Sequence, residues 1–223
     1  LYESGLTVSR VDPLFAGLRE NVAPLVKKVM QSGTKPDMSW VHNNTWSKKG
    51  QEGLSQSISE AIGFDFNAGR RDASTHPFCG GPNPDDVRWT TRYDEKDPFG
   101  SLYGSMHETG HGLYEQGRPR HLDFQPTGSA NGLGVHESQS RLWENQIGRS
   151  REFCEWALPI WKEHFPEQMK GVSAEDLWRS VNFVEPSLIR VEADEATYNL
   201  HIMIRYEIEK KLISGEIEVD DLP

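Results

Sequence analysis

The sequence predicts a mainly α-helical fold with a small β-hairpin or sheet placed before one central helix. Apolar residues recur three or four positions apart, the helical spacing, through most of the 223-residue chain. Alternation of β-forming residues is clear in residues 86–93, and it follows a stretch rich in turn-forming residues, 73–84. With 35% hydrophobic and 26% charged residues, the composition is that of a soluble globular protein.

Two helices are expected in the first third of the chain. Asp12 and Pro13 are placed to start the first helix, and Gly33 is placed to stop it. Pro24 lies inside this helix and should kink or split it, because proline lacks the amide proton that a helix interior needs. Residues 50–62 form the second expected helix, with apolar side chains on one side.

The central helix is expected to begin at Asp97, a good N-cap, with Pro98 in the first helical position. It continues through Tyr114 with an apolar stripe close to helical period. Four glycines lie within it, and each costs about 1 kcal/mol relative to alanine. They indicate either a poor helix or a helix that other backbone or substrate approaches closely; they are residues 100, 104, 110 and 112.

Four further helical segments are expected in the second half of the chain. They cover residues 135–147, 151–165, 174–183 and 195–213. Apolar residues surround most of the circumference of the last and longest one, so we expect it to be buried.

Charge and cysteine content exclude several classes of protein. The net charge of −10 and the pI near 5.3 argue against a general nucleic-acid or anionic-membrane surface. No apolar run approaches the roughly 20 residues of a membrane span, and the first residues lack the features of a signal peptide. Cys79 and Cys154 are far apart and form no Cys-x-x-Cys pair, so a reducing compartment, the cytoplasm, is expected.

The central helix carries the pattern His-Glu-x-x-His. In a helix His107 and His111 lie one turn apart on one face, where two imidazoles can bind a single metal ion. Glu108 then projects beside the metal and can take a proton from water. This pattern predicts a metal-dependent hydrolase.

A catalytic metal needs a third protein ligand, and Glu137 is the best candidate for it. It follows His111 by 26 residues, which is far enough for the next helix to return alongside the first. His136 is the rival, but neighbouring side chains on a helix point about 100° apart, so only one of the two can face the metal. Two histidines and a carboxylate suit Zn²⁺ and also accept Co²⁺ or Mn²⁺.

The chain resembles the carboxypeptidase Taq family of metallocarboxypeptidases. Five of its motifs occur here in the family's order: His76-Pro77-Phe78, Asp86-Val87-Arg88-Trp89-Thr90, His107-Glu108-Thr109-Gly110-His111, His136-Glu137-Ser138 and Ile189-Arg190-Val191-Glu192-Ala193-Asp194. The resemblance implies a mostly helical metallopeptidase fold with a deep substrate groove. It also implies a homodimer that removes single residues from the free C-termini of peptides.

The same resemblance implies roles for individual residues and an extent for the chain. His107, His111 and Glu137 would bind the metal, and Glu108 would be the general base and acid. A further family motif, Gly-x-x-Gln-Asp-x-His-Trp, is absent, and family members are longer at both ends. We therefore expect residues 1–223 to be a single catalytic-core region, a fragment of a larger peptidase.

Five further residues are candidates for the chemistry, each with a structural alternative. Tyr198 and His201, one turn apart, could stabilise a developing oxyanion or could be core residues. Arg88 and Arg190 could bind the terminal carboxylate of a peptide, since guanidinium binds carboxylate in a bidentate manner. Either arginine could instead form an ion pair, Arg88 with Asp86 or Asp94 and Arg190 with Glu192 or Asp194.

His76 is the fifth such candidate. It precedes a proline, which favours extended backbone and suits a residue that lines a groove, although a simple loop histidine is the alternative.

Three functions compete on this reading of the sequence. The first is a zinc-dependent carboxypeptidase, and the second is a metallo-oligopeptidase or endopeptidase. The third is a fragment that binds metal or peptide without turnover. None of them involves nucleic acid or a membrane.

Overall fold

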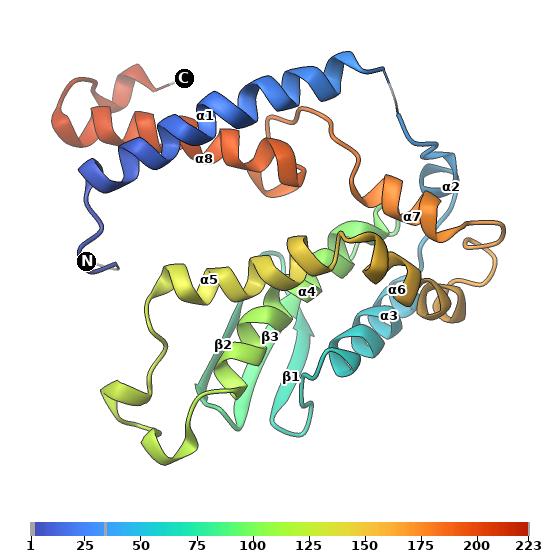
Figure 1. The fold of residues 1–223 in the computed structure, drawn as a ribbon. Coiled ribbons are helices and arrows are strands. Elements are labelled where there is room, and N and C mark those ends of the chain that lie inside the picture. The colour runs from blue at the N-terminus through green and yellow to red at the C-terminus, as the bar shows by residue number, and fades with distance from the viewer. Residues whose placement is uncertain (1–2, 34, 223) are drawn as a thin grey trace. The chain divides into compact units, whose positions relative to one another are not determined.

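The computed structural model describes residues 3–33 and 35–222 and confirms the mainly helical class with a small sheet (Figure 1). The chain divides into two compact units. The first unit holds Glu3 and residues 36–181, and the second holds residues 4–33, 35 and 182–222.

The first unit begins with a short helix, α2 (Ser39–His42), and continues with α3 (Lys48–Ala61). The hydroxyl of Ser47 accepts a hydrogen bond from the amide of Gly50 and so caps α3 at its N-terminus. This helix agrees with the one predicted for residues 50–62.

A three-stranded sheet follows, as the alternating residues predict. Its strands are β1 (Gly69–Ala73), β2 (Cys79–Asn83) and β3 (Asp86–Thr91), in the order β1-β3-β2. β3 pairs antiparallel with β2 and parallel with β1. The sequence predicted the strand β3 but neither of its partners. β1, Gly-Arg-Arg-Asp-Ala, lacks β-forming residues, and β2 lies within the stretch 73–84 that is rich in turn-forming residues; both form by pairing with β3.

The central helix, α4 (Pro98–Gln116), contacts both β2 and β3. The Asp97 carboxylate accepts hydrogen bonds from the amides of Phe99 and Gly100, as expected of an N-cap. Two of its four glycines are closely packed against other elements: a Cβ atom on Gly110 would lie 2.6 Å from the Gln139 carbonyl oxygen, and one on Gly112 would lie 2.6 Å from the Phe64 ring.

Two 3₁₀ turns, Arg120–Leu122 and Pro126–Gly128, connect α4 to α5 (Leu133–Arg141). A π-helical turn, Leu142–Ile147, extends α5, so the predicted helix 135–147 is α-helical in its first part only. The remaining helices of the unit are α6 (Arg151–His164) and α7 (Ala174–Val181).

Aromatic residues dominate the core of the first unit. The main cluster joins α3, α4, α6 and α7, and a smaller one lies between the sheet and α4. The bulkiest fully buried side chains are Trp46, Trp89, Trp161 and Phe165. Burial of these large apolar surfaces provides the main driving force for folding of this unit.

The second unit is built on two long helices that pack along each other, α1 (Val8–Gln31) and α8 (Glu195–Ser214) (Figure 1). The ring of Phe15 meets that of Tyr206 edge to face, and the Asp12 carboxylate accepts hydrogen bonds from Tyr206 and Lys210. Two 3₁₀ turns, Arg190–Glu192 and Val219–Asp221, flank α8.

Two features of this unit differ from the expectations. α1 begins at Val8 rather than at Asp12 and continues through Pro13 and Pro24, so Pro24 does not split it. α8 is not buried around its circumference: Ile204 and Ile213 are 57% and 80% exposed. Among the described residues α8 packs along α1 on one side, so the apolar residues on its other sides stay accessible.

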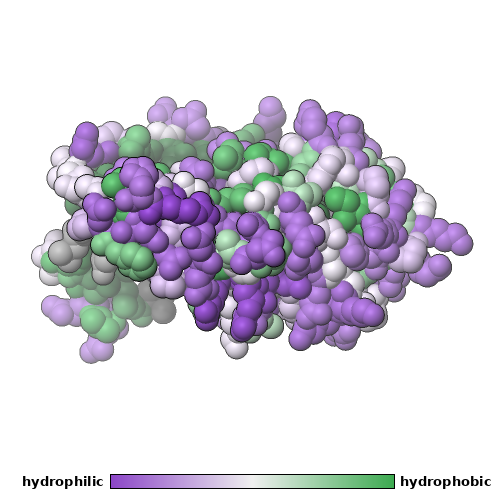
Figure 2. Space-filling view, turned by 90° about the horizontal axis from the view of Figure 1, so that it is seen from below, coloured by the Kyte–Doolittle hydropathy of each residue, from purple (hydrophilic) through white to green (hydrophobic). Residues whose placement is uncertain are grey.

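The surface mixes polar and apolar residues. On the face drawn in Figure 2, hydrophilic residues are interspersed with hydrophobic ones. Among the described residues, no helix combines the length and the apolar content that crossing a membrane requires.

Candidate metal centre

α4 places His107 and His111 on one face, one turn apart. Their rings meet nearly perpendicular, with centroids 4.9 Å apart, and both side chains are largely buried. The fixed start of α4 at Asp97 sets the phase of this face, so the motif directs both imidazoles to the same side.

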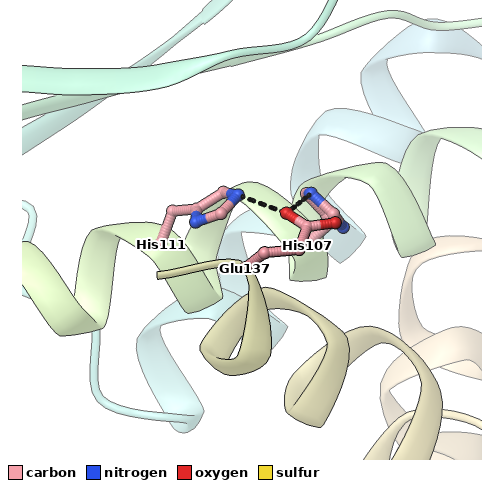
Figure 3. A group of neighbouring side chains, drawn as sticks. All are labelled: His107, His111 and Glu137. Carbon is pink, nitrogen blue, oxygen red and sulfur yellow. Dashed lines mark ion pairs between the residues drawn. The ribbon is translucent and has the colours of Figure 1, made fainter. Parts of the chain in front are cut away.

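α5 brings Glu137 to these two histidines (Figure 3). Its Oε2 atom lies 3.5 Å from Nε2 of His107 and 3.3 Å from Nε2 of His111. The three ligand atoms all lie within 4.8 Å of one another. The close passage of α5 over Gly110 permits this approach, since a side chain there would meet the backbone of Gln139.

These distances fit a divalent ion. Ligands about 2.1 Å from a tetrahedral metal are about 3.4 Å from each other, which matches both separations from Glu137. Two imidazole nitrogens and one carboxylate oxygen are also the donor set of a catalytic zinc site. The residues present therefore fit a metal with an open position for water.

The electrostatics agree with this assignment. Burial opposes ionisation of Glu137, but hydrogen bonds from His107 and His111 outweigh it and hold the pKa of this carboxyl far below its ordinary value. Burial would lower the pKa of His107, yet its hydrogen bonds to Glu137 and Glu144 raise that pKa to about 9. The site is therefore rich in negative charge and suited to a cation.

Glu108 lies on α4 between the two histidines in sequence and is buried. Burial raises the pKa of Glu108 to about 7, with the neighbouring His107 charge opposing the rise and that of Glu137 adding to it. A carboxyl with a pKa near neutrality can both accept and return a proton.

Glu144 is a residue of the site that the sequence reading missed. It lies on the π-helical turn, and its Oε2 accepts a hydrogen bond from Nδ1 of His107 at 2.7 Å. Arg141 donates to the same oxygen at 3.2 Å. The spacing of seven residues from Glu137, two helical turns, is the signal that could have placed Glu144 on the same face.

The rival ligand, His136, lies elsewhere. Its Nδ1 is 2.5 Å from Nδ1 of His111, whereas Glu137 faces the Nε2 atom of that ring. The structure thus separates the two neighbours as the helical geometry requires, with Glu137 beside both imidazoles.

The two predicted substrate-binding residues of the first unit, Arg88 and His76, lie at its surface. Arg88 is exposed and makes a two-pronged ion pair with Asp86, at 2.8 and 2.9 Å, which is the structural alternative considered for it. His76 is exposed in the turn before β2, and its carbonyl oxygen accepts a hydrogen bond from Ser74. The roles of Arg88 and His76 in binding substrate stay predictions.

The other three candidates belong to the second unit. Arg190 donates to the hydroxyl of Tyr198 and lies over its ring, and His201 follows one turn later on α8. The side chain of Glu192, one alternative partner of Arg190, lies outside the described residues. The roles of Arg190, Tyr198 and His201 stay predictions.

Fold and site together define a helical protein with a candidate two-histidine, one-carboxylate metal centre. The family model described as Carboxypeptidase Taq (M32) metallopeptidase matches residues 1–223. The chain therefore belongs to this metallopeptidase family, and the family resemblance is confirmed.

Curated relatives and solved structures agree. Carboxypeptidase 1 of Bacillus subtilis is 47% identical over the whole chain, and thermostable carboxypeptidase 1 of Thermus thermophilus is 46% identical. The chain covers 44% and 43% of these proteins, so it spans less than half of their length. An M32 carboxypeptidase structure from Deinococcus radiodurans R1 is 42% identical, matches with a TM-score of 0.95 over 99% of this chain, and is itself covered to 44%.

Proposed function

We propose that the protein is a metal-dependent carboxypeptidase that removes single residues from the free C-termini of peptides. One observation carries the proposal: Nε2 of His107 and Nε2 of His111 both face one oxygen of Glu137, with the buried Glu108 beside them. The names of the relatives support it, since each is called a carboxypeptidase.

The mechanism assigns proton transfer to Glu108. His107, His111 and Glu137 would hold the divalent ion, which would supply Lewis acidity for activating water and polarising a carbonyl. Glu108 takes the proton from the attacking water and later gives it to the departing amine.

The remaining site residues have proposed roles in binding. Tyr198 and His201 stabilise the oxyanion, and Arg88 and Arg190 bind the terminal carboxylate of the peptide. His76 lines a deep substrate groove. For Arg88 this requires exchange of Asp86 for substrate, since the two side chains pair in the structure.

The proposal extends to the metal and the assembly. Zn²⁺ is the proposed ion because the donor set is that of catalytic zinc sites, with Co²⁺ and Mn²⁺ as substitutes. Residues 1–223 form one catalytic-core region, and the protein is a cytoplasmic homodimer. Light scattering of the purified protein measures the dimer, and a monomeric mass would contradict it.

The decisive experiment compares peptides with free and amidated C-termini. We expect release of the terminal amino acid from the free peptide alone, and loss of release in the Glu108→Gln variant by at least 10²-fold, because the amide cannot take a proton. Cleavage of both peptides at internal bonds would instead indicate an endopeptidase. Unchanged release by Glu108→Gln would remove Glu108 from the mechanism.

A further inference from the structure

A chain of hydrogen bonds leaves the candidate metal centre on the far side of His111. Nδ1 of His111 is 2.5 Å from Nδ1 of His136, and Nε2 of His136 is 2.7 Å from a carboxylate oxygen of Glu115. His111 and Glu115 lie one turn apart on α4, while His136 lies on α5. The three side chains therefore form a closed link between the two helices that carry the candidate ligands.

The Glu115 carboxylate at the end of this link decides which atom is the donor in each hydrogen bond. An ionised carboxylate can only accept, so Nε2 of His136 carries a proton and donates it to Glu115. In a neutral imidazole the other nitrogen, Nδ1 of His136, is then an acceptor. Nδ1 of His111 must supply the proton between the two rings.

This arrangement leaves the lone pair of His111 on Nε2, the atom that lies 3.3 Å from Glu137. The opposite direction of donation, from His136 to His111, would put the proton of a neutral His111 on Nε2 and block it as a ligand. The link thus selects the tautomer that a metal ion requires.

We propose that His136 is a positioning residue that holds His111 in its metal-binding tautomer and orientation. Because His136 donates from Nε2 to Glu115, its Nδ1 is free to accept the hydrogen bond from Nδ1 of His111. The proposal rests on the proposed metal centre and deepens it. Nδ1 of His107 is hydrogen-bonded directly to a carboxylate, that of Glu144. Nδ1 of His111 is instead hydrogen-bonded to His136, which in turn is hydrogen-bonded to the Glu115 carboxylate.

The surroundings of His136 fix it in place. The ring of Tyr114 meets it edge to face, with centroids 5.0 Å apart. Arg118 pairs with the Glu115 carboxylate at 3.1 Å and holds that acceptor on α4. Partners on the outer nitrogen of a ligand histidine commonly alter metal affinity 10- to 100-fold when removed.

Metal affinity of the purified protein tests the proposal without using activity. Co²⁺ titration followed by visible absorption, with Zn²⁺ competition, gives the dissociation constant. We expect His136→Ala to weaken binding 10- to 100-fold, and His136→Asn to recover part of the loss, because its side-chain oxygen can accept from His111. His42→Asn, an exposed histidine on α2, is the matched control and should bind as the wild type does.

The wild-type protein supplies a second readout that does not depend on a variant folding. In its Zn²⁺-bound form, ¹⁵N chemical shifts of the imidazoles should show the proton of His111 on Nδ1 and that of His136 on Nε2. A proton on Nδ1 of His136, or full affinity in His136→Ala, would overturn the proposal while leaving the metal centre intact. Failure of the wild type to bind Co²⁺ would instead refute the metal centre itself, and the positioning role with it.

Discussion

At the scale of single residues, Gly110 connects the sequence motif to the site. A Cβ atom there would lie 2.6 and 2.7 Å from backbone atoms of Gln139 and Ser140, which cannot move aside as a flexible side chain would. We expect Gly110→Ala to force α5 away from α4, to lower the free energy of unfolding by about 1–3 kcal/mol, and to weaken Co²⁺ binding by separating Glu137 from the histidines.

Gly104 provides the matched control on the same helix. A Cβ atom there would meet only Thr91, at an ordinary contact distance of 3.7 Å. Gly104→Ala should therefore leave Co²⁺ affinity unchanged and stabilise α4 by up to about 1 kcal/mol. Urea unfolding and Co²⁺ titration measure both variants, and equal behaviour of the two would contradict the role assigned to Gly110.

The two cysteines give a prediction about reactivity. Burial raises the pKa of Cys154 to about 12, and burial together with the charges of Glu108 and Glu115 raises that of Cys79 even further above its ordinary value. Since only the thiolate reacts rapidly, we expect iodoacetamide at pH 8 to modify neither thiol in the folded protein and both in urea. Mass spectrometry measures the modification, and rapid labelling of the folded protein would show the thiols to be accessible.

At the scale of elements, the cap of α4 sets where the helix with the candidate ligands His107 and His111 begins. The Asp97 carboxylate accepts from two of the free amides of the first turn. We expect Asp97→Ala to cost about 1 kcal/mol in urea unfolding, and Asp97→Asn to retain most of the stability because asparagine also caps helices. A loss of equal size in both variants would show that the charge, rather than the hydrogen bonds, stabilises the helix end.

Local sequence preferences predicted some of the elements and not others. Helical periodicity and the cap predicted α4, and alternation predicted β3, because these preferences act between neighbours in sequence. β1, β2 and the π-helical turn were not predicted. β1 has residues with little β preference and forms by pairing with β3, and the π-helical turn that carries Glu144 has no signature in the residues 142–147 themselves.

At the scale of the whole molecule, metal binding should stabilise one unit of the two. The candidate ligands all lie in the first unit, and so do all 7 tryptophans, so tryptophan fluorescence reports the unfolding of this unit alone. We expect free Zn²⁺ at 100 times its dissociation constant to raise the free energy of unfolding of this unit by about 2.7 kcal/mol, and EDTA to reverse the change.

Circular dichroism near 222 nm reports both units and serves as the comparison. Zn²⁺ should raise the midpoint of the thermal transition that is followed by fluorescence. α1 and α8 belong to the second unit, so the midpoint of their part of the helical signal should stay unchanged when the two units unfold separately. A fluorescence transition whose midpoint temperature does not change with Zn²⁺ would contradict the metal centre.

The sequence by itself determined the helical class and the His-Glu-x-x-His motif on α4, and it limited the expected third ligand to one of the two neighbours His136 and Glu137. Spacing along a helix decides which side chains share a face, so these features needed only local geometry. Tertiary structure alone decided that α5 passes over Gly110 closely enough to bring Glu137 to His107 and His111. It also decided the exposure of α8 and the bonds from His111 through His136 to Glu115, because contacts between distant segments depend on how whole elements pack.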